Sequence, residues 1–157
     1  MHDIFLSGDS KYIENILGED DLLELNQYIQ TQKENRNYFE EMTLKSGIVP
    51  RLMRQEYEKI EGKGIPIYRH PCDKNLNSFP FNSHIIKIRD NITNRLGVDK
   101  QEFNHCLIQY YRNSRDNISL HSDKTLDIHE GSMIVNYSIG ASRTMLFRKK
   151  KDKVNKR

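Results

Sequence analysis

A histidine and an aspartate separated by one residue, His121 and Asp123, carry the strongest chemical signal in the sequence. At the end of a strand, side chains two residues apart point to the same side, so this imidazole and this carboxylate can bind one divalent metal ion. They would be two of the three ligands of a 2-His-1-carboxylate iron site. The only histidine after Asp123 is His129, which is expected in a loop from which it could reach the same ion. The third ligand therefore stays open at this stage.

Length and composition indicate one soluble domain. The chain has 157 residues, of which 36% are hydrophobic and 30% charged, and its mean hydropathy of −0.81 predicts a thin core. No stretch approaches the roughly 18 apolar residues that a membrane helix needs, and the first residues do not resemble a signal peptide. The sequence therefore predicts a protein of the cytoplasm or nucleus that does not contact the membrane.

The two cysteines, Cys72 and Cys106, lie far apart and form no CxxC motif, so we expect reduced, half-buried thiols rather than a disulfide framework. A zinc site built from both cysteines with His70 and His105 is the alternative, because two Cys and two His would suffice. Their spacing matches no zinc module, which favours the thiols.

The net charge is +3 with a pI near 8.8, and basic residues concentrate in 148–151 and 153–157. Such a cluster can neutralise phosphates, although a charge run at a terminus is usually a solvated tail. A basic nucleic-acid-binding module without chemistry therefore remains a hypothesis.

Two helices are predicted from spacing. We expect the acidic pair 20–21 to cap the first helix and Ser83 to cap the second, with Gly97 as a left-handed stop at its end. Residues 22, 25, 28 and 29 form the apolar face of the first helix, and 85, 88, 92 and 96 that of the second. Between residues 34 and 64 the pattern is mixed and is broken by Pro50, and 64–71 looks extended.

Beyond the second helix the pattern changes to short strands at 105–112, 117–120, 132–139 and 144–148. Helices followed by strands favour an α+β domain in which N-terminal helices pack on a sheet. We expect a helical N-terminal and substrate-covering region over 1–100, the first part of a β-core over 101–151, and a basic tail over 152–157. Asp116 is predicted to accept backbone donors in a turn, and Arg143 and Arg148 to face solvent from a strand.

From about residue 64 to 151 the sequence resembles the AlkB-like branch of the 2-oxoglutarate/iron(II) dioxygenases, most closely its uncharacterised fungal-type members. The order of features is specific: a tyrosine, then His-Ser-Asp, then a hydrophobic strand that ends in Gly-Ala-x-Arg. The likeness rests on residues 66–71, 107–112, 116–118, 121–128, 131–132, 134–141 and 143–144.

The resemblance implies roles for residues that match the family pattern. His121 and Asp123 take the positions of the first two ligands of Fe(II), and Tyr111 that of a tyrosine that hydrogen-bonds 2-oxoglutarate. Asn136 lies in a strand that faces the same cofactor, and Gln109 stands where many relatives have an asparagine that contacts it. The alternative for His121 and Asp123 is a hydrogen-bonded surface pair that binds no metal.

The resemblance also implies substrate contacts. Arg51 and Tyr68 are candidates for the substrate cover that N-terminal segments form in AlkB-like proteins, and solvent-facing or sheet-capping roles are the equal alternative. Thr125 stands where repair members have an acidic residue that reads the damaged base, so an alkylated base is less firmly implied than the reaction itself.

The family fold is a double-stranded β-helix, or jelly roll, and the family has a second metal-binding histidine and an arginine that pairs with the distal carboxylate of 2-oxoglutarate. Neither is found here, so we expect a partial jelly-roll sheet and a truncated enzyme. By resemblance it would use Fe(II), 2-oxoglutarate and O2 to hydroxylate or oxidatively demethylate a substrate such as alkylated nucleic acid. The alternative is an inactive remnant or binding protein that retains half of the fold.

Overall fold

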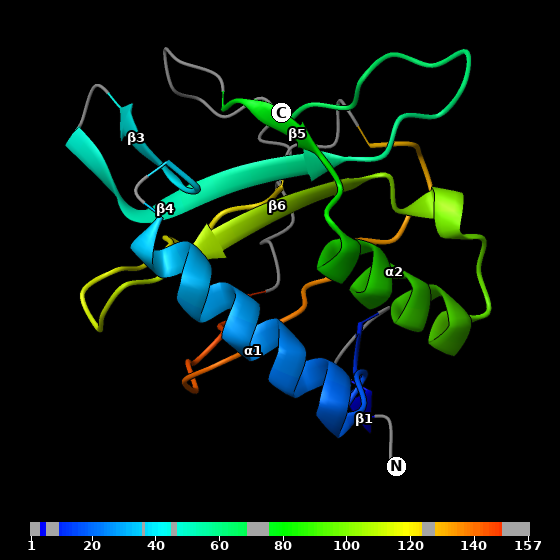
Figure 1. Cartoon of the computed structure of the whole chain (residues 1–157), viewed down its shortest axis with the longest axis horizontal. Coiled ribbons are helices and arrows are strands. Elements are labelled where there is room, and N and C mark those ends of the chain that lie inside the picture. Colours follow the sequence, from blue (N-terminus) through cyan, green and yellow to red (C-terminus); the bar gives the residue numbers. More distant parts are fainter. Residues whose placement is uncertain are drawn as a thin grey trace, which may run out of the picture.

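The computed structural model describes residues 4–5, 10–35, 37–44, 47–68, 76–123 and 128–148. The elements are, in chain order, β1 (Ile4–Phe5), β2 (Lys11–Tyr12), α1 (Glu19–Glu34), β3 (Glu40–Leu44), β4 (Gly47–Tyr57), β5 (Ser78–Pro80), α2 (Ser83–Leu96), the short 3-10 helix η1 (Lys100–Glu102) and β6 (His105–Tyr110). Figure 1 shows α1 and α2 beside a sheet whose longest strand is β4. The predicted α+β class is confirmed.

β4 is the central strand of a four-stranded sheet. β6 pairs antiparallel along one edge, from Leu52 opposite Tyr110 to Tyr57 opposite His105. The other edge is shared, because β3 pairs antiparallel with the first part of β4 and β5 pairs parallel with its last three residues. β4 lies between residues 34 and 64, where the sequence pattern is mixed. It therefore adds a strand that was not predicted to the first hundred residues.

Pro50 lies inside β4, where a residue without a backbone N–H would normally interrupt a ladder. It is tolerated because the register between β3 and β4 shifts between Glu41 and Thr43, which leaves this part of β4 outside the regular pairs. On the other edge, β6 pairs only from Leu52 onward. The proline therefore sits where neither neighbour requires its N–H.

Both predicted helices are confirmed, with small changes at their beginnings. α1 follows an extended Gly18 and carries three acidic residues in its first turn, which favours its N-terminus through the helix dipole. α2 is capped by Asn82 rather than Ser83, because the Asn82 side chain accepts hydrogen bonds from the backbone N–H groups of His84 and Ile85. Its end at Gly97 is confirmed, with a left-handed φ of 68°.

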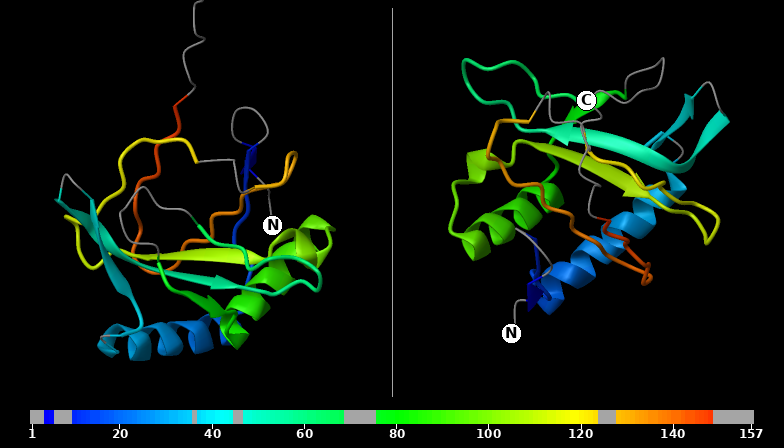
Figure 2. Two further views of the ribbon diagram at one scale, coloured as in Figure 1. Left: turned by 90° about the horizontal axis from the view of Figure 1, so that it is seen from above. Right: turned by 180° about the vertical axis from the view of Figure 1, so that it is seen from behind.

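The apolar core is small and lies around β4. Met42, Val49, Met53 and Leu76 are buried together, and Leu107 from β6 packs against them. α1 lies on one side of the sheet and the segment 128–148 on the other, as the view from above shows (Figure 2). The first helix therefore packs on a sheet that has only a small apolar core.

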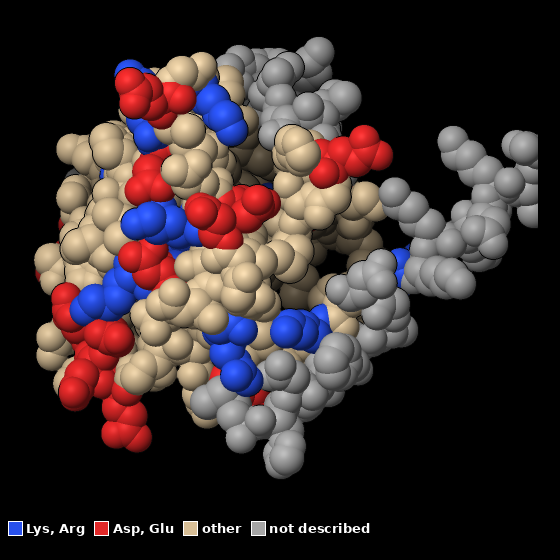
Figure 3. Space-filling model, turned by 90° about the vertical axis from the view of Figure 1, so that its right-hand side faces the viewer, with Lys and Arg blue, Asp and Glu red and all other residues tan. Residues whose placement is uncertain are grey.

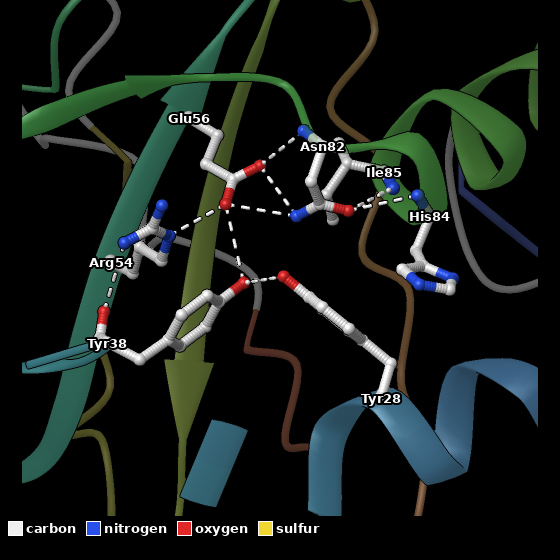
Figure 4. Close-up of polar contacts among 7 residues, drawn as sticks. All are labelled: Tyr28, Tyr38, Arg54, Glu56, Asn82, His84 and Ile85. Carbon is white, nitrogen blue, oxygen red and sulfur yellow. Dashed lines mark hydrogen bonds and ion pairs between the residues drawn. The ribbon is translucent and has the colours of Figure 1, made fainter. Parts of the chain in front are cut away.

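A buried polar cluster joins the helices to the sheet (Figure 4). Glu56 of β4 is fully buried and accepts hydrogen bonds from Arg54, from Tyr38 and from both the backbone and side-chain N–H groups of Asn82. Tyr28 of α1 donates to the Tyr38 hydroxyl at 3.0 Å. Burial raises the pKa of Tyr38, so this hydroxyl stays a donor to the carboxylate. The carboxylate of Glu56 therefore connects α1, β4 and the start of α2.

Three of the four predicted C-terminal strands are absent. The strand predicted at 105–112 forms as β6, whereas 117–120, 132–139 and 144–148 have no regular structure. A strand is stabilised by hydrogen bonds to a neighbouring strand, and these segments pair with no described strand. Their apolar side chains are exposed instead, among them Ile134, Val135, Leu146 and Phe147. Arg143 and Arg148 consequently lie in irregular backbone rather than in a strand.

None of the helices within the described ranges has both the length and the apolar character needed to cross a membrane.

Candidate functional site

The candidate site begins at the end of β6. Gln109 and Tyr111 lie two residues apart, and the Tyr111 hydroxyl donates to the Gln109 side-chain oxygen at 3.4 Å. Gln109 is the pairing partner of Met53, so it stands on the register position next to the apolar core. A phenol and an amide in this arrangement offer donors and an acceptor to a polar ligand.

His121 and Asp123 converge. The His121 Nε2 atom lies 3.3 Å from Asp123 Oδ1, and the two side chains are 49% and 48% exposed. The other ring nitrogen, Nδ1, lies 2.7 Å from the carbonyl oxygen of Ser119. Because a carbonyl can only accept, Nδ1 carries a hydrogen, and in the neutral ring Nε2 presents its lone pair to the carboxylate.

This arrangement fits a metal ion. A lone pair facing a carboxylate oxygen is repulsive unless a proton or a metal cation lies between them. Two ligand atoms that lie about 2.1 Å from one ion at a right angle are roughly 3.0 Å apart, close to the separation seen here. The hydrogen bond from Nδ1 to a backbone carbonyl is also the contact that commonly orients a metal-binding imidazole.

Among the residues that the structure describes, no third protein ligand joins this pair. Within the described part of the chain, no group of three or more His, Cys, Asp or Glu side chains is placed to hold a metal ion. His129 is exposed, and its Nδ1 lies 2.9 Å from the carbonyl oxygen of Glu130. Two protein ligands leave several positions of an ion open to small molecules.

The loop between Tyr111 and His121 is held by an arginine–aspartate pair. Asp116, only 4% exposed, accepts hydrogen bonds from the backbone N–H of Arg112 and from its guanidinium at 2.7 and 2.9 Å. The predicted role of Asp116 as an acceptor in a turn is confirmed. Sequence analysis missed the side-chain pair, although the spacing of four residues was visible. It also missed Arg143, which donates to carbonyl oxygens of the same loop.

The Asp116 pair predicts an acid-sensitive contribution to stability. Hydrogen bonding from Arg112 lowers the pKa of Asp116 to about 2. A lowered native pKa means that this stabilisation is fully present above about pH 4 and is lost as the pH falls toward 2. We expect the difference in free energy of unfolding between the wild type and Asp116→Asn to become smaller over this range. Urea denaturation midpoints of both proteins from pH 7 to pH 2 measure this difference. A difference that stays constant would contradict the assignment.

The residues expected to contact the substrate, and Asn136, which is expected to contact 2-oxoglutarate, lie in different environments. Arg51 is 8% exposed and donates through Nη1 to the carbonyl of Asn117 at 3.2 Å, so the solvent-facing alternative is wrong for it. Tyr68 is half-buried, and its backbone N–H donates to Gln55 at 2.8 Å. Asn136 is exposed, and its side-chain oxygen accepts from Ser138. Thr125 lies outside the described residues.

The zinc alternative gains no support from the residues that the structure describes. His105 Nε2 lies 3.1 Å from the side-chain oxygen of Gln55, and burial lowers the pKa of His105. Cys106 is a free, half-buried thiol, as predicted, and burial raises its pKa to about 12, which disfavours the thiolate that zinc needs. His70 and Cys72 lie outside the described residues.

Charged side chains of both signs interleave on the face shown in Figure 3, so this face presents no uniformly basic patch. Lys87 pairs with Asp21 and Glu24. Most of the basic cluster, residues 149–157, lies outside the described residues, and the hypothesis of a basic binding module stays a prediction.

Comparisons with known proteins identify the family. The model of the 2OG-Fe(II) oxygenase superfamily matches residues 9–157. The DNA oxidative demethylase ALKBH2 of Homo sapiens is 39% identical over 64 residues, which are 41% of this chain and 23% of the relative. The chain thus spans less than a quarter of that relative's length in the match. No solved structure matches significantly. The resemblance to AlkB-like proteins is confirmed, and the chain belongs to the 2OG-Fe(II) oxygenase superfamily.

Proposed function

We propose that the chain carries the metal-binding and co-substrate-binding part of an AlkB-like dioxygenase that hydroxylates or oxidatively demethylates alkylated nucleic acid. The observation that carries the proposal is the His121–Asp123 pair, with a 3.3 Å separation between the two ligand atoms and with Nδ1 held by Ser119. Family membership supports Fe(II) and 2-oxoglutarate as the groups that such a pair would serve. The fold proposed for this part is the beginning of a jelly roll.

His121 and Asp123 would hold the iron, and the bound iron with 2-oxoglutarate would supply the oxygen-activating chemistry. The contribution of the protein is orientation. The carbonyl oxygen of Ser119 holds Nδ1 of His121, so Nε2 is the ring nitrogen that would bind the ion. Both side chains are about half exposed, so small co-substrates can approach them from solvent.

Tyr111 and Gln109 are the proposed contacts of 2-oxoglutarate within the first part of the site. The phenol can donate to a carboxylate, and the amide can donate as well as accept, so together they can orient a dicarboxylate beside the metal. Asn136 is proposed to face the same co-substrate.

Alkylated DNA is the proposed substrate class because the relative is described as a DNA oxidative demethylase. Arg51, Tyr68 and Thr125 are the proposed substrate contacts. Of these, Arg51 is the most informative, because its Nε atom is buried and has no hydrogen-bond partner among the described residues. A buried N–H without a partner is unfavourable, so this N–H would gain an acceptor only if a substrate group entered beside it.

Succinate formation tests the proposed function. The purified chain with Fe(II), 2-oxoglutarate and methylated DNA in air should release succinate and formaldehyde, because demethylation through hydroxylation produces both. His121→Ala should reduce both to the level of iron without protein, since one of two ligands is lost. Equal amounts of product from the wild type and His121→Ala would contradict the proposal. If methylated DNA gives no product, the same assay with methylated RNA and methylated peptides shows whether only the proposed substrate class is wrong.

A second candidate is a binding protein without turnover. It is favoured by one observation, that His121 and Asp123 are joined by no third protein ligand within the described ranges. This candidate predicts metal and 2-oxoglutarate binding without succinate, so the same assay, combined with equilibrium binding, separates the two.

A further inference from the structure

We propose that Arg143 is a positioning residue that fixes the plane of the Tyr111 ring and the shape of the loop that leads to His121. This inference rests on the proposed function, because Tyr111 is the proposed contact of 2-oxoglutarate. Arg143 itself touches neither proposed ligand of the metal in the contacts that the structure gives. Its effect would be indirect, through the backbone and the aromatic ring that it holds.

The guanidinium of Arg143 makes three contacts with one short loop. Its central carbon lies 4.4 Å from the centroid of the Tyr111 ring. Nη1 donates to the carbonyl oxygen of Asn113 at 3.3 Å, and Nη2 donates to the carbonyl oxygen of Asp116. One side chain from about thirty residues later in the chain therefore spans the loop from its first residue to its sixth.

The other side of the loop is held independently. The Asp116 carboxylate receives the guanidinium and backbone N–H of Arg112, so Asp116 is bound through its carboxylate and, by Arg143, through its carbonyl. The next residue, Asn117, donates its backbone N–H to Pro50 at 2.9 Å and accepts from Arg51. The loop is therefore fixed against β4 four residues before His121.

These contacts fit a role in positioning better than a role in packing. Arg143 is exposed and lies outside any helix or strand, so its removal opens no core cavity. Hydrogen bonds from an exposed side chain, and an exposed cation over an aromatic ring, each contribute little to the stability of the whole fold. All of them are directed at the loop that carries Tyr111. Loss of Arg143 should therefore change the order of this loop more than the stability of the fold.

The geometry requires a planar, forked cation. A guanidinium can lie on a ring while its two terminal nitrogens donate in different directions, whereas the ammonium of lysine is a compact point charge. Arg143→Lys keeps the charge and should behave almost like Arg143→Ala if the fork and the stack are what matters. Arg148, which is also exposed and follows in the same segment, provides the matched control as Arg148→Ala.

The first measurement needs no ligand. Backbone amide hydrogen exchange over residues 111–117, followed by mass spectrometry, should be about five to ten times faster in Arg143→Ala and Arg143→Lys than in the wild type, because carbonyl contacts that restrain the loop are lost. Arg148→Ala should exchange like the wild type. Exchange within β4 and α2 should stay unchanged in all variants, which separates a local effect from global unfolding. Unchanged exchange at 111–117 would overturn the inference whatever the chain binds.

The second measurement is a double-mutant cycle on 2-oxoglutarate affinity, titrated anaerobically with Fe(II) present. Arg143→Ala and Tyr111→Ala should each weaken binding by about tenfold, while their combination should weaken it hardly more than Tyr111→Ala alone, because Arg143 acts through the ring. Fully multiplied effects, or unchanged affinity in Arg143→Ala, would overturn the inference. If the wild type binds no 2-oxoglutarate, the proposed function fails, and the exchange measurement still decides whether Arg143 fixes the loop.

Discussion

Replacing Glu56 with glutamine is expected to lower the free energy of unfolding by about 3 kcal/mol, in the range found when one partner of a buried ion pair is removed. The carboxylate is fully buried, and it is the acceptor for the Arg54 guanidinium at 2.7 Å. Arg54 is itself enclosed between two aromatic rings, with its central carbon 4.2 Å from the Tyr38 centroid and 3.8 Å from that of Phe79. Without Glu56 this cation would be left largely buried and unpaired. Urea denaturation followed by circular dichroism measures the loss.

The same substitution should also weaken the beginning of α2. Glu56 receives both N–H groups at Asn82, and this orientation leaves the Asn82 side-chain oxygen free to cap the helix. A glutamine at this place would direct its own amide N–H toward N–H groups that the Glu56 carboxylate accepts. Glu61→Gln provides the control, because Glu61 is exposed, and it should change stability by less than about 0.5 kcal/mol. If the two variants are equally stable, the cluster does not join the helices to the sheet.

The helices could be predicted from the sequence because their signals are local. The spacing of Leu22 and Leu25 gave α1, and the left-handed stop at Gly97 gave the end of α2. The beginning of α2 was displaced by one residue because Ser83 and Asn82 are both good caps. Only the tertiary contact with Glu56 selects Asn82.

The central strand β4 was not predicted, because Pro50 is a strong local argument against a strand. The proline is accommodated by the register shift opposite it in β3, a feature of pairing that the sequence of β4 alone does not encode. The opposite error occurred at 132–139 and 144–148, where a strand-like alternation forms no strand. Apolar alternation describes how a strand would bury one face, but it does not supply the neighbour.

The juxtaposition of His121 and Asp123 was expected from their spacing at the end of a strand. The structure places the two side chains together in irregular backbone instead, with the imidazole held by the carbonyl of Ser119. Arg143 could not be assigned in this way, because Asp116, one of its partners in the loop, lies 27 residues earlier in the chain. Long-range contacts of a charged, exposed residue leave no periodic signal in the sequence.

Replacing Asp123 with asparagine is expected to weaken metal binding at least about 100-fold. Changes in residues that merely orient a metal ligand already weaken binding by about 10-fold to 100-fold, and Asp123→Asn removes the negative charge of a proposed ligand itself. Asparagine keeps the size of the side chain, and at an exposed position the fold should be unaffected. Mn(II) suits the same imidazole and carboxylate donors, so the free Mn(II) signal in electron paramagnetic resonance measures the affinity directly.

His129→Ala is the informative control for this measurement, because His129 is exposed and its imidazole is engaged with the carbonyl of Glu130 rather than with the pair. It should bind Mn(II) within about twofold of the wild type, whereas His121→Ala should match Asp123→Asn. Losses of equal size in all three variants would instead identify His129 as the third ligand. Unchanged binding in Asp123→Asn would return His121 and Asp123 to a hydrogen-bonded surface pair.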